Sequence, residues 1–289
     1  MLDIDNNNFY YKFCSINNYT KENLKLNQFY FSNPMNFNDP FDSRTDCIYR
    51  GTRKGWEHYL RKNGINISIN TLIKEGTLKR KGSELLLNPN KKGLPHTEAK
   101  YGSDLGEDHF CRVSCFTKKY KNILMWSHYA DSHKGICLCI NSEPYSDNSG
   151  HFLRLDSDPE KYPFIKVNYS EEMPKQLNLL YINEWPDIID FVRTKHTDWT
   201  YEQEYRLVVN LQGQNEMCLK KFPKNNLKAI IFGLKIEKDD VKDIYEIIRD
   251  NYLGKGIDVE FFKVMPIPRK YAIEIKKIES MNKYLNKLQ

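Results

Sequence analysis

The sequence predicts an α+β fold, with a mixed or antiparallel β-sheet core and segregated helices. Short runs of alternating or continuous apolar residues recur along the chain, and such runs are typical of strands. Two segments, 122–131 and 237–256, have the apolar spacing and the end signals of amphipathic helices. The sequence shows no internal repeat and no flexible linker, so we expect a single domain over residues 1–289.

The first part of the chain alternates short apolar segments with loops rich in Asn and Pro. Region 51–105 mixes helical patches with Gly and Asn breakers and holds much of the basic excess. We therefore interpret it as a basic, partly helical insertion. Before it, in order, we expect a strand over 8–16, a helix and turn over 19–28, a strand over 28–34 and a polar loop over 35–44.

The second part contains most of the expected strands. A long helical region over 174–199 is expected to break or kink at Pro186, because proline lacks the N–H that a helix interior needs. Gly135 is expected to end the helix over 122–131 as the residue after its C-cap. The expected strands lie over 110–119, 135–141, 164–171, 202–211, 227–236, 257–267 and 271–278.

Charge and hydropathy place the protein in a broad class. The formal net charge is +6, and the mean hydropathy is −0.69. The positive charge suits phosphates but is too dispersed to identify a nucleic-acid binder. The sequence has no apolar run of the roughly 20 residues that a membrane helix needs, and its start has no signal-peptide pattern. We expect a cytoplasmic protein without membrane contact.

The seven cysteines lack the spacing of common metal sites. Cys137 and Cys139 alternate on one face of a buried strand, so a zinc set that joins them to His128 and His133 is disfavoured. We expect reduced cysteines and no bound metal.

The segment "WTYEQEYRLVV" combines charged residues with an apolar strand. In a strand, Glu202, Glu204 and Arg206 share one face, so the two carboxylates could divide roles while Arg206 keeps at least one of them ionised. The alternative is an edge strand with protective charges, which the spacing alone favours.

Three further groups of residues have either a functional or a purely structural interpretation, and the sequence pattern leaves both open. His128 lies beside an apolar helical stripe, as a packed residue or as a general base. The loop residues Asn38, Asp39 and Asp42 either bind a cation or a sugar hydroxyl or form Asx turns around Pro40, which we favour. The third group is Tyr11 and Lys12 in the first strand, where simple amphipathic packing is the alternative.

The common nucleotide, protease and hydrolase motifs are missing from the sequence. The segments "YYKF", "FSNPMNFNDPFD", "CFTKKYKNILMWSHYADSHKGICL", "WTYEQEYRL" and "AIIFG" are instead similar in type and order to the bacterial and phage family called domain of unknown function 2971. This resemblance spans roughly residues 10–233, and it implies a role in phage defence or in a toxin system.

The layout also resembles, more weakly, that of the ADP-ribosyltransferases, which have a split sheet. This resemblance implies NAD as the substrate, with Glu204 stabilising the ribose oxocarbenium and Glu202 orienting the acceptor. The family's first-strand residue would be Tyr11 or Lys12, and its second strand would supply Tyr30 and Ser32. Tyr30 or Trp126 would stack on nicotinamide, Lys12 would reach the diphosphate, and Arg206 would be a further cofactor-binding residue. The chain departs from the family by lacking a clear Arg or His in the first strand and a Ser-Thr-Ser element.

The alternative is a metal-dependent nuclease or a nucleic-acid-binding defence module. Asp39, Asp42, Glu202 and Glu204 would then be the candidate Mg²⁺ ligands, and the basic insertion would hold phosphates. A third alternative is a sensor or interaction protein without catalysis. The expected partners are accordingly a nucleic acid or a protein acceptor, and a regulatory partner or antitoxin suits a toxin-like enzyme.

Overall fold

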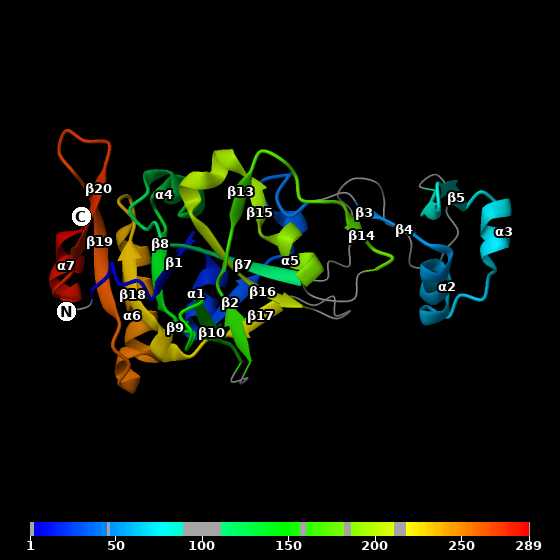
Figure 1. Cartoon of the computed structure of the whole chain (residues 1–289). Helices are drawn as coiled ribbons and strands as arrows, with labels where there is room; N and C mark the ends of the chain where they lie inside the picture. The colour runs from blue at the N-terminus through cyan, green and yellow to red at the C-terminus, as the bar shows by residue number, and fades with distance from the viewer. Residues whose placement is uncertain are drawn as a thin grey trace.

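An eight-stranded mixed sheet forms the centre of the molecule (Figure 1). The computed structural model describes residues 3–44, 47–88, 111–156, 160–181, 186–210 and 218–288. Neighbouring strands are antiparallel except for β18 and β19, which confirms the α+β class. In sheet order the strands are β12 (Ile165–Lys166), β16 (Glu204–Asn210), β7 (Cys111–Thr117), β1 (Phe9–Cys14), β8 (Ile136–Asn141), β18 (Leu227–Phe232), β19 (Glu260–Pro266) and β20 (Ile273–Lys277).

Helices cover both faces of this sheet. Side chains alternate along each strand, so Ile136, Leu138 and Ile140 of β8 face one core, whereas Cys137 and Cys139 face the other. The first core is covered by α1 (Asn18–Lys25), α6 (Lys238–Asn251) and α7 (Met281–Lys287), and the second by α4 (Ile123–Tyr129). None of the described helices combines the length and the apolar character that crossing a membrane requires.

The sheet opens between β1 and β7. These two strands share one registered pair, Tyr11 with Thr117, whereas β1 is paired with β8 along its whole length. Beyond that pair, Lys12 Nζ donates to the Cys115 carbonyl at 3.2 Å and so bridges the two strands through a side chain.

Small sheets and turns surround the main sheet. β2 (Gln28–Phe31) pairs with β17 (Cys218–Lys221) and lies against β7 through the bridge between Ser32 and Val113. The other pairings join β9 (Glu143–Pro144), β10 (His151–Arg154) and β11 (Lys161–Pro163), then β13 (Asn168–Ser170) with β15 (Thr194–His196), and β14 (Leu177–Asn178) with β3 (Cys47–Ile48). The 3-10 helices are η1 (Pro34–Asn36), η2 (Thr197–Glu202), η3 (Lys224–Asn226) and η4 (Leu253–Lys255).

Residues 50–88 form a small lobe with its own core. It contains α2 (Arg53–Lys62), α3 (Ile69–Lys74), β4 (Arg50–Gly51), β5 (Leu78–Lys81) and β6 (Glu84–Leu87), at the end of the molecule opposite to α7 (Figure 1). Trp56 is fully buried there, and its indole N–H donates to the Leu85 carbonyl. The rest of the expected insertion, 89–105, lies outside the described residues, and the single-domain expectation stays a prediction.

Three expected elements are wrong in detail. The expected helix over 174–199 is replaced by β14, a short α5 (Pro186–Val192), β15 and η2, because Lys195 of β15 is drawn into a buried ion cluster. The expected strand over 164–171 is divided into β12 and β13. The expected helix end at Gly135 instead falls at Tyr129. Gly135 is needed for another reason, since an added Cβ would lie 2.2 Å from the Cys14 carbonyl oxygen.

Candidate active site

A buried cluster of charged side chains lies where η2 enters β16. Gln203 has a φ of 44°, and this left-handed residue joins the end of η2 to the start of β16. Glu202 therefore belongs to η2, and the expectation that it alternates with Glu204 along one strand is wrong. Both side chains are nevertheless buried, and both reach Lys195. The interpretation of these residues as protective surface charges is excluded by that burial.

Arg206 holds the cluster together from inside the core. Its guanidinium is 0% exposed, and its Nε donates to Glu204 Oε1 at 2.7 Å. Its two terminal nitrogens donate to Asp42, from Nη1 to Oδ1 at 2.8 Å and from Nη2 to Oδ2 at 2.6 Å. Arg206 also donates to Ser43 Oγ and to the Val192 carbonyl. The planar guanidinium thus fixes two carboxylates in a single orientation.

Lys195 of β15 approaches the same carboxylates from the other side. Its Nζ lies 2.6 Å from Glu202 Oε2, 3.2 Å from Glu204 Oε2 and 3.5 Å from Asp42 Oδ2. The Tyr129 hydroxyl of α4 donates to the remaining oxygen of Glu202 at 2.5 Å. Burial raises the pKa of this phenol, so it remains a hydrogen-bond donor at neutral pH.

The two glutamates have opposite protonation behaviour. Burial raises the pKa of Glu202 above its ordinary value, and the nearby negative charge of Glu204 adds to this effect, although Lys195 opposes it. Burial acts in the same direction on Glu204, but Arg206 and Lys195 outweigh it and hold its pKa well below the ordinary value. Glu204 is therefore a fixed negative charge, and Glu202 is the residue suited to exchange a proton.

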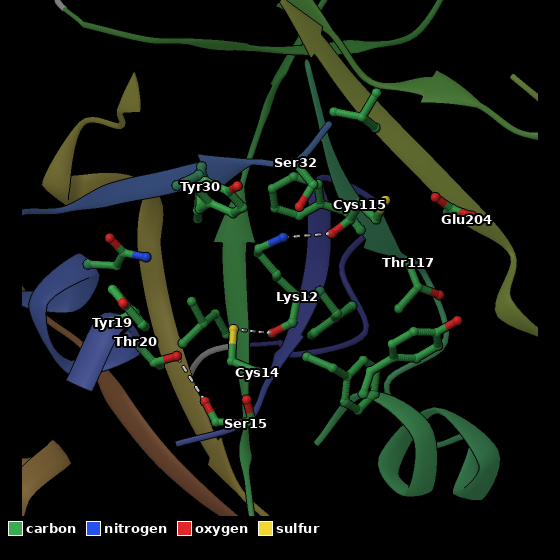
Figure 2. Close-up of a pocket in the computed structure, with 18 of the residues that line it drawn as sticks. Lys12, Cys14, Ser15, Tyr19, Thr20, Tyr30, Ser32, Cys115, Thr117 and Glu204 are labelled. Atoms are coloured by element: carbon green, nitrogen blue, oxygen red, sulfur yellow. Dashed lines mark hydrogen bonds between the residues drawn. The ribbon is translucent and has the colours of Figure 1, made fainter. Parts of the chain in front are cut away.

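The cluster forms one end of a large pocket. The pocket volume is about 1030 Å³, at the upper end of the range typical of small-molecule sites. Figure 2 shows Lys12 in the middle of it, between Glu204 on one side and Ser15, Tyr19 and Thr20 on the other. Lys12 Nζ donates to Ser114 Oγ and to the Cys115 carbonyl, which are uncharged acceptors, so it has no carboxylate partner among the described residues.

Most of the residues singled out from the sequence line this pocket. His128 is exposed at the rim, so it is a pocket residue and does not pack in the core. The lining includes Lys12, Tyr30, Ser32, Asn38, Asp42, His128, Glu202 and Glu204.

Trp126 and Tyr11 do not fit the expected roles. Trp126 is fully buried, and its indole N–H donates to the Tyr120 carbonyl, so it cannot stack on a ligand in the pocket. Tyr11 borders the pocket, but its ring packs against Tyr120 and its hydroxyl donates to the Ile4 carbonyl. Of the two first-strand candidates, Lys12 is therefore the one that reaches the pocket.

Arg206 acts from behind the pocket wall, whereas Asn38 and Asp42 of the acidic loop line the pocket. Arg206 does not line the pocket, so the expectation that it binds the cofactor is wrong, and it acts by holding Glu204 and Asp42. Asp39 Oδ1 accepts from the Phe41 N–H, which confirms the Asx-turn interpretation for this residue, whereas Asp42 is an ion-pair partner. Among the described residues, no group of three His, Cys, Asp or Glu side chains has the arrangement of a metal site.

Lys195 and Tyr129 are site residues that sequence reasoning missed. Lys195 lies in a segment whose pattern indicated a helix, so nothing in its surroundings pointed to a strand. The charge balance could have indicated a missing cation. Three buried carboxylates around Arg206 need a second positive side chain. Tyr129 lies in the α4 segment, one residue after His128, and its position in the helical pattern gave no reason to choose it.

Comparison with known proteins gives one family-model match, which covers part of the chain. A family model described as "Protein of unknown function (DUF2971)" matches residues 125–207. Neither the curated proteins nor the solved structures give a match. The matched segment runs from α4 to β16 and contains Tyr129, Lys195, Glu202, Glu204 and Arg206. The match confirms the resemblance to DUF2971 over residues 125–207 of the 289-residue chain, and this segment supplies most of the buried ion cluster.

Proposed function

We propose that the protein is a toxin-like enzyme that transfers ADP-ribose from NAD to a macromolecular acceptor. The observation that carries this proposal is the charge pattern of the pocket. Three carboxylates face two cations at one end, so with all of them ionised the described cluster holds one negative charge in excess. Lys12, with no carboxylate partner among the described residues, lies in the middle. NAD has the complementary pattern, with a cationic nicotinamide riboside next to an anionic diphosphate.

The cluster suits the transition state of this transfer. When the bond between nicotinamide and C1′ of the ribose breaks, its electron pair leaves with nicotinamide, and positive charge develops on the ribose. Glu204 is ionised and held by Arg206 and Lys195, so its charge needs no reorganisation to stabilise that cation. A group fixed in this way stabilises the transition state more than the ground state.

Glu202 would supply the proton transfer. The acceptor nucleophile attacks C1′, forms the new bond and loses a proton, which the Glu202 carboxylate can take up. Its raised pKa brings it closer to the neutral range in which a general base works best. Lys195 and Tyr129 hold its two oxygens, so they act as positioning residues.

The ion pairs also bear on the nuclease alternative. Asp42 and Glu204 would be two of the Mg²⁺ ligands, yet both are already bound by the Arg206 guanidinium and approached by Lys195. A cation placed there would meet two positive side chains at close range. The transferase therefore fits the described geometry better.

The test follows nicotinamide release and label transfer from NAD labelled in its ADP-ribose part, with cell lysate as the source of acceptor. The wild type is expected to release nicotinamide and to label an acceptor, also in the presence of a chelator. Glu204→Gln should lower the rate by about 10²-fold or more, since a preorganised charge is lost. The matched control is Glu274→Gln, a half-buried glutamate of β20 that is paired with Lys276 and lies outside the pocket lining.

Two outcomes would refute the proposal. One is a Glu204→Gln variant that folds, by circular dichroism, and keeps the wild-type rate. The other is a wild type that is toxic without consuming NAD and that cleaves nucleic acid only when no chelator is present. Lys12→Met leaves the ion cluster intact and should weaken NAD binding, so it tests the pocket even if Glu204→Gln fails to fold.

A further inference from the structure

The pocket has a second polar end, beside α1, that the transfer chemistry does not use. Figure 2 shows Ser15, Tyr19 and Thr20 on the side of Lys12 opposite to Glu204. Ser15 follows Lys12 by three residues, roughly 10 Å along an extended chain. Asn23 of α1 and Gln28 of β2 line the same pocket. A ligand that extends from Glu204 past Lys12 therefore has its far end at these residues.

Asn23 and Gln28 form a pair with hydrogen-bonding groups that no side chain in the described part of the protein uses. Gln28 Nε2 donates to Asn23 Oδ1 at 3.0 Å, and both side chains are partly buried. A carboxamide offers two donors and one acceptor oxygen, so Gln28 Oε1 remains as an acceptor and Asn23 Nδ2 remains as a donor. The pair presents an acceptor next to a donor, and adenine presents the reverse, an amino donor next to a ring-nitrogen acceptor.

An apolar platform lies on the same face of β2. Gln28 and Tyr30 are two residues apart in the strand, so their side chains share a face. Tyr30 is directly opposite Leu219 of β17, and the two side chains are 40% and 38% exposed although both line the pocket. Exposed aromatic and aliphatic surface inside a pocket suits the flat face of a nucleobase.

From these contacts we infer that the α1 end of the pocket binds adenine, with Tyr30 and Leu219 against the face of the base. The amino group of the base donates to Gln28 Oε1, and a ring nitrogen accepts from Asn23 Nδ2. Tyr30 thereby takes the adenine end of the ligand and not the nicotinamide end that the sequence resemblance implied. The inference rests on the proposed function for the direction in which the ligand extends through the pocket. The recognition of adenine itself is argued from Asn23, Gln28, Tyr30 and Leu219.

The test measures the binding of two diphosphates by titration calorimetry. ADP and IDP differ at C6 of the base, where IDP has an oxo group that would face Gln28 Oε1, and the neighbouring N1 of IDP carries a proton. Wild type is expected to bind ADP about tenfold more tightly than IDP, or better, as one bidentate base contact allows. Gln28→Leu should remove this preference, and Tyr30→Ala should weaken both ligands about tenfold. Asn282→Leu, an exposed amide of α7, is the matched control and should behave as wild type.

Equal affinities of the wild type for ADP and IDP would overturn the inference. A Gln28→Leu variant that unfolds at the wild-type temperature and still prefers ADP would do so too. ADP carries no nicotinamide, so these results do not depend on transfer. A preference for ADP without any consumption of NAD would support the adenine site and refute the proposed function. Transfer of ADP-ribose without a preference for ADP would support the proposed function and refute the adenine site.

Discussion

Two short charged runs in this chain have similar sequences and opposite environments. "EQEYRLVV" (202–209) and "KRKGSELLL" (79–87) both place charged residues beside an apolar segment. In the first, Glu202, Glu204 and Arg206 are buried, whereas in the second Lys79, Arg80 and Lys81 are exposed. The difference arises elsewhere in the chain, since Arg206 meets Asp42 across 164 positions of sequence. Buried charge is tolerated where distant segments bring the opposite charge to it.

The largest effect is expected from Arg206→Met. Methionine fits the space but leaves Asp42 and Glu204 buried without their main partner, and breaking such a pair typically costs about 3–5 kcal/mol. Urea unfolding of the variant should therefore show a free energy of unfolding lower by about that amount. Arg80→Met in β5 makes the same chemical change on the exposed run and should cost less than about 0.5 kcal/mol. Similar losses of unfolding free energy in the two variants would show that burial does not make the two charged runs different.

A smaller effect is expected from pH, which should change the contributions of Glu204 and Glu202 to the free energy of unfolding in opposite directions. The pKa of Glu204 is lowered in the folded state, so its stabilising contribution is complete above its ordinary value of 4.5 and is lost as the pH falls below it. The pKa of Glu202 is raised, so its contribution is complete below 4.5 and is lost as the pH rises above it. Each pKa unit corresponds to about 1.4 kcal/mol.

The measurement is the free energy of unfolding at several pH values for wild type, Glu202→Gln and Glu204→Gln. The advantage of wild type over Glu204→Gln should shrink as the pH falls below 4.5. Relative to Glu202→Gln, wild type should lose stability as the pH rises above 4.5. Parallel pH profiles for the three proteins would contradict the different roles given to the two glutamates.

The sequence predicted the part of this site that local periodicity governs. Glu204 and Arg206 alternate on one face of β16 as expected, and the apolar runs correctly indicated β1, β7, β8 and β18. Glu202 was misplaced because one left-handed residue, Gln203, separates it from β16, which begins only at Glu204. The role of Trp126 was wrong because helical spacing alone does not show which side of α4 meets the sheet.

The remaining misses come from contacts that only the fold establishes. Lys195 lies in β15, where its Nζ reaches Asp42 of the distant acidic loop as well as Glu202 and Glu204, so tertiary contacts override a helix-like local pattern. The base-binding pair Asn23 and Gln28 depends on the turn between α1 and β2, which brings the two amides to 3.0 Å. Such contacts follow from the fold, so they become visible only when the fold is known.

The smallest effect is expected where the exposed run itself is changed. β5 is the edge of the sheet β4–β6–β5, and exposed Lys and Arg on an edge strand prevent pairing with another chain. Replacing Lys79, Arg80 and Lys81 by Gln should therefore alter the free energy of unfolding by less than about 0.5 kcal/mol per site. It should instead increase self-association, which sedimentation can measure. A large loss of stability without association would mean that this run, like the one in β16, has charged partners that its exposure does not suggest.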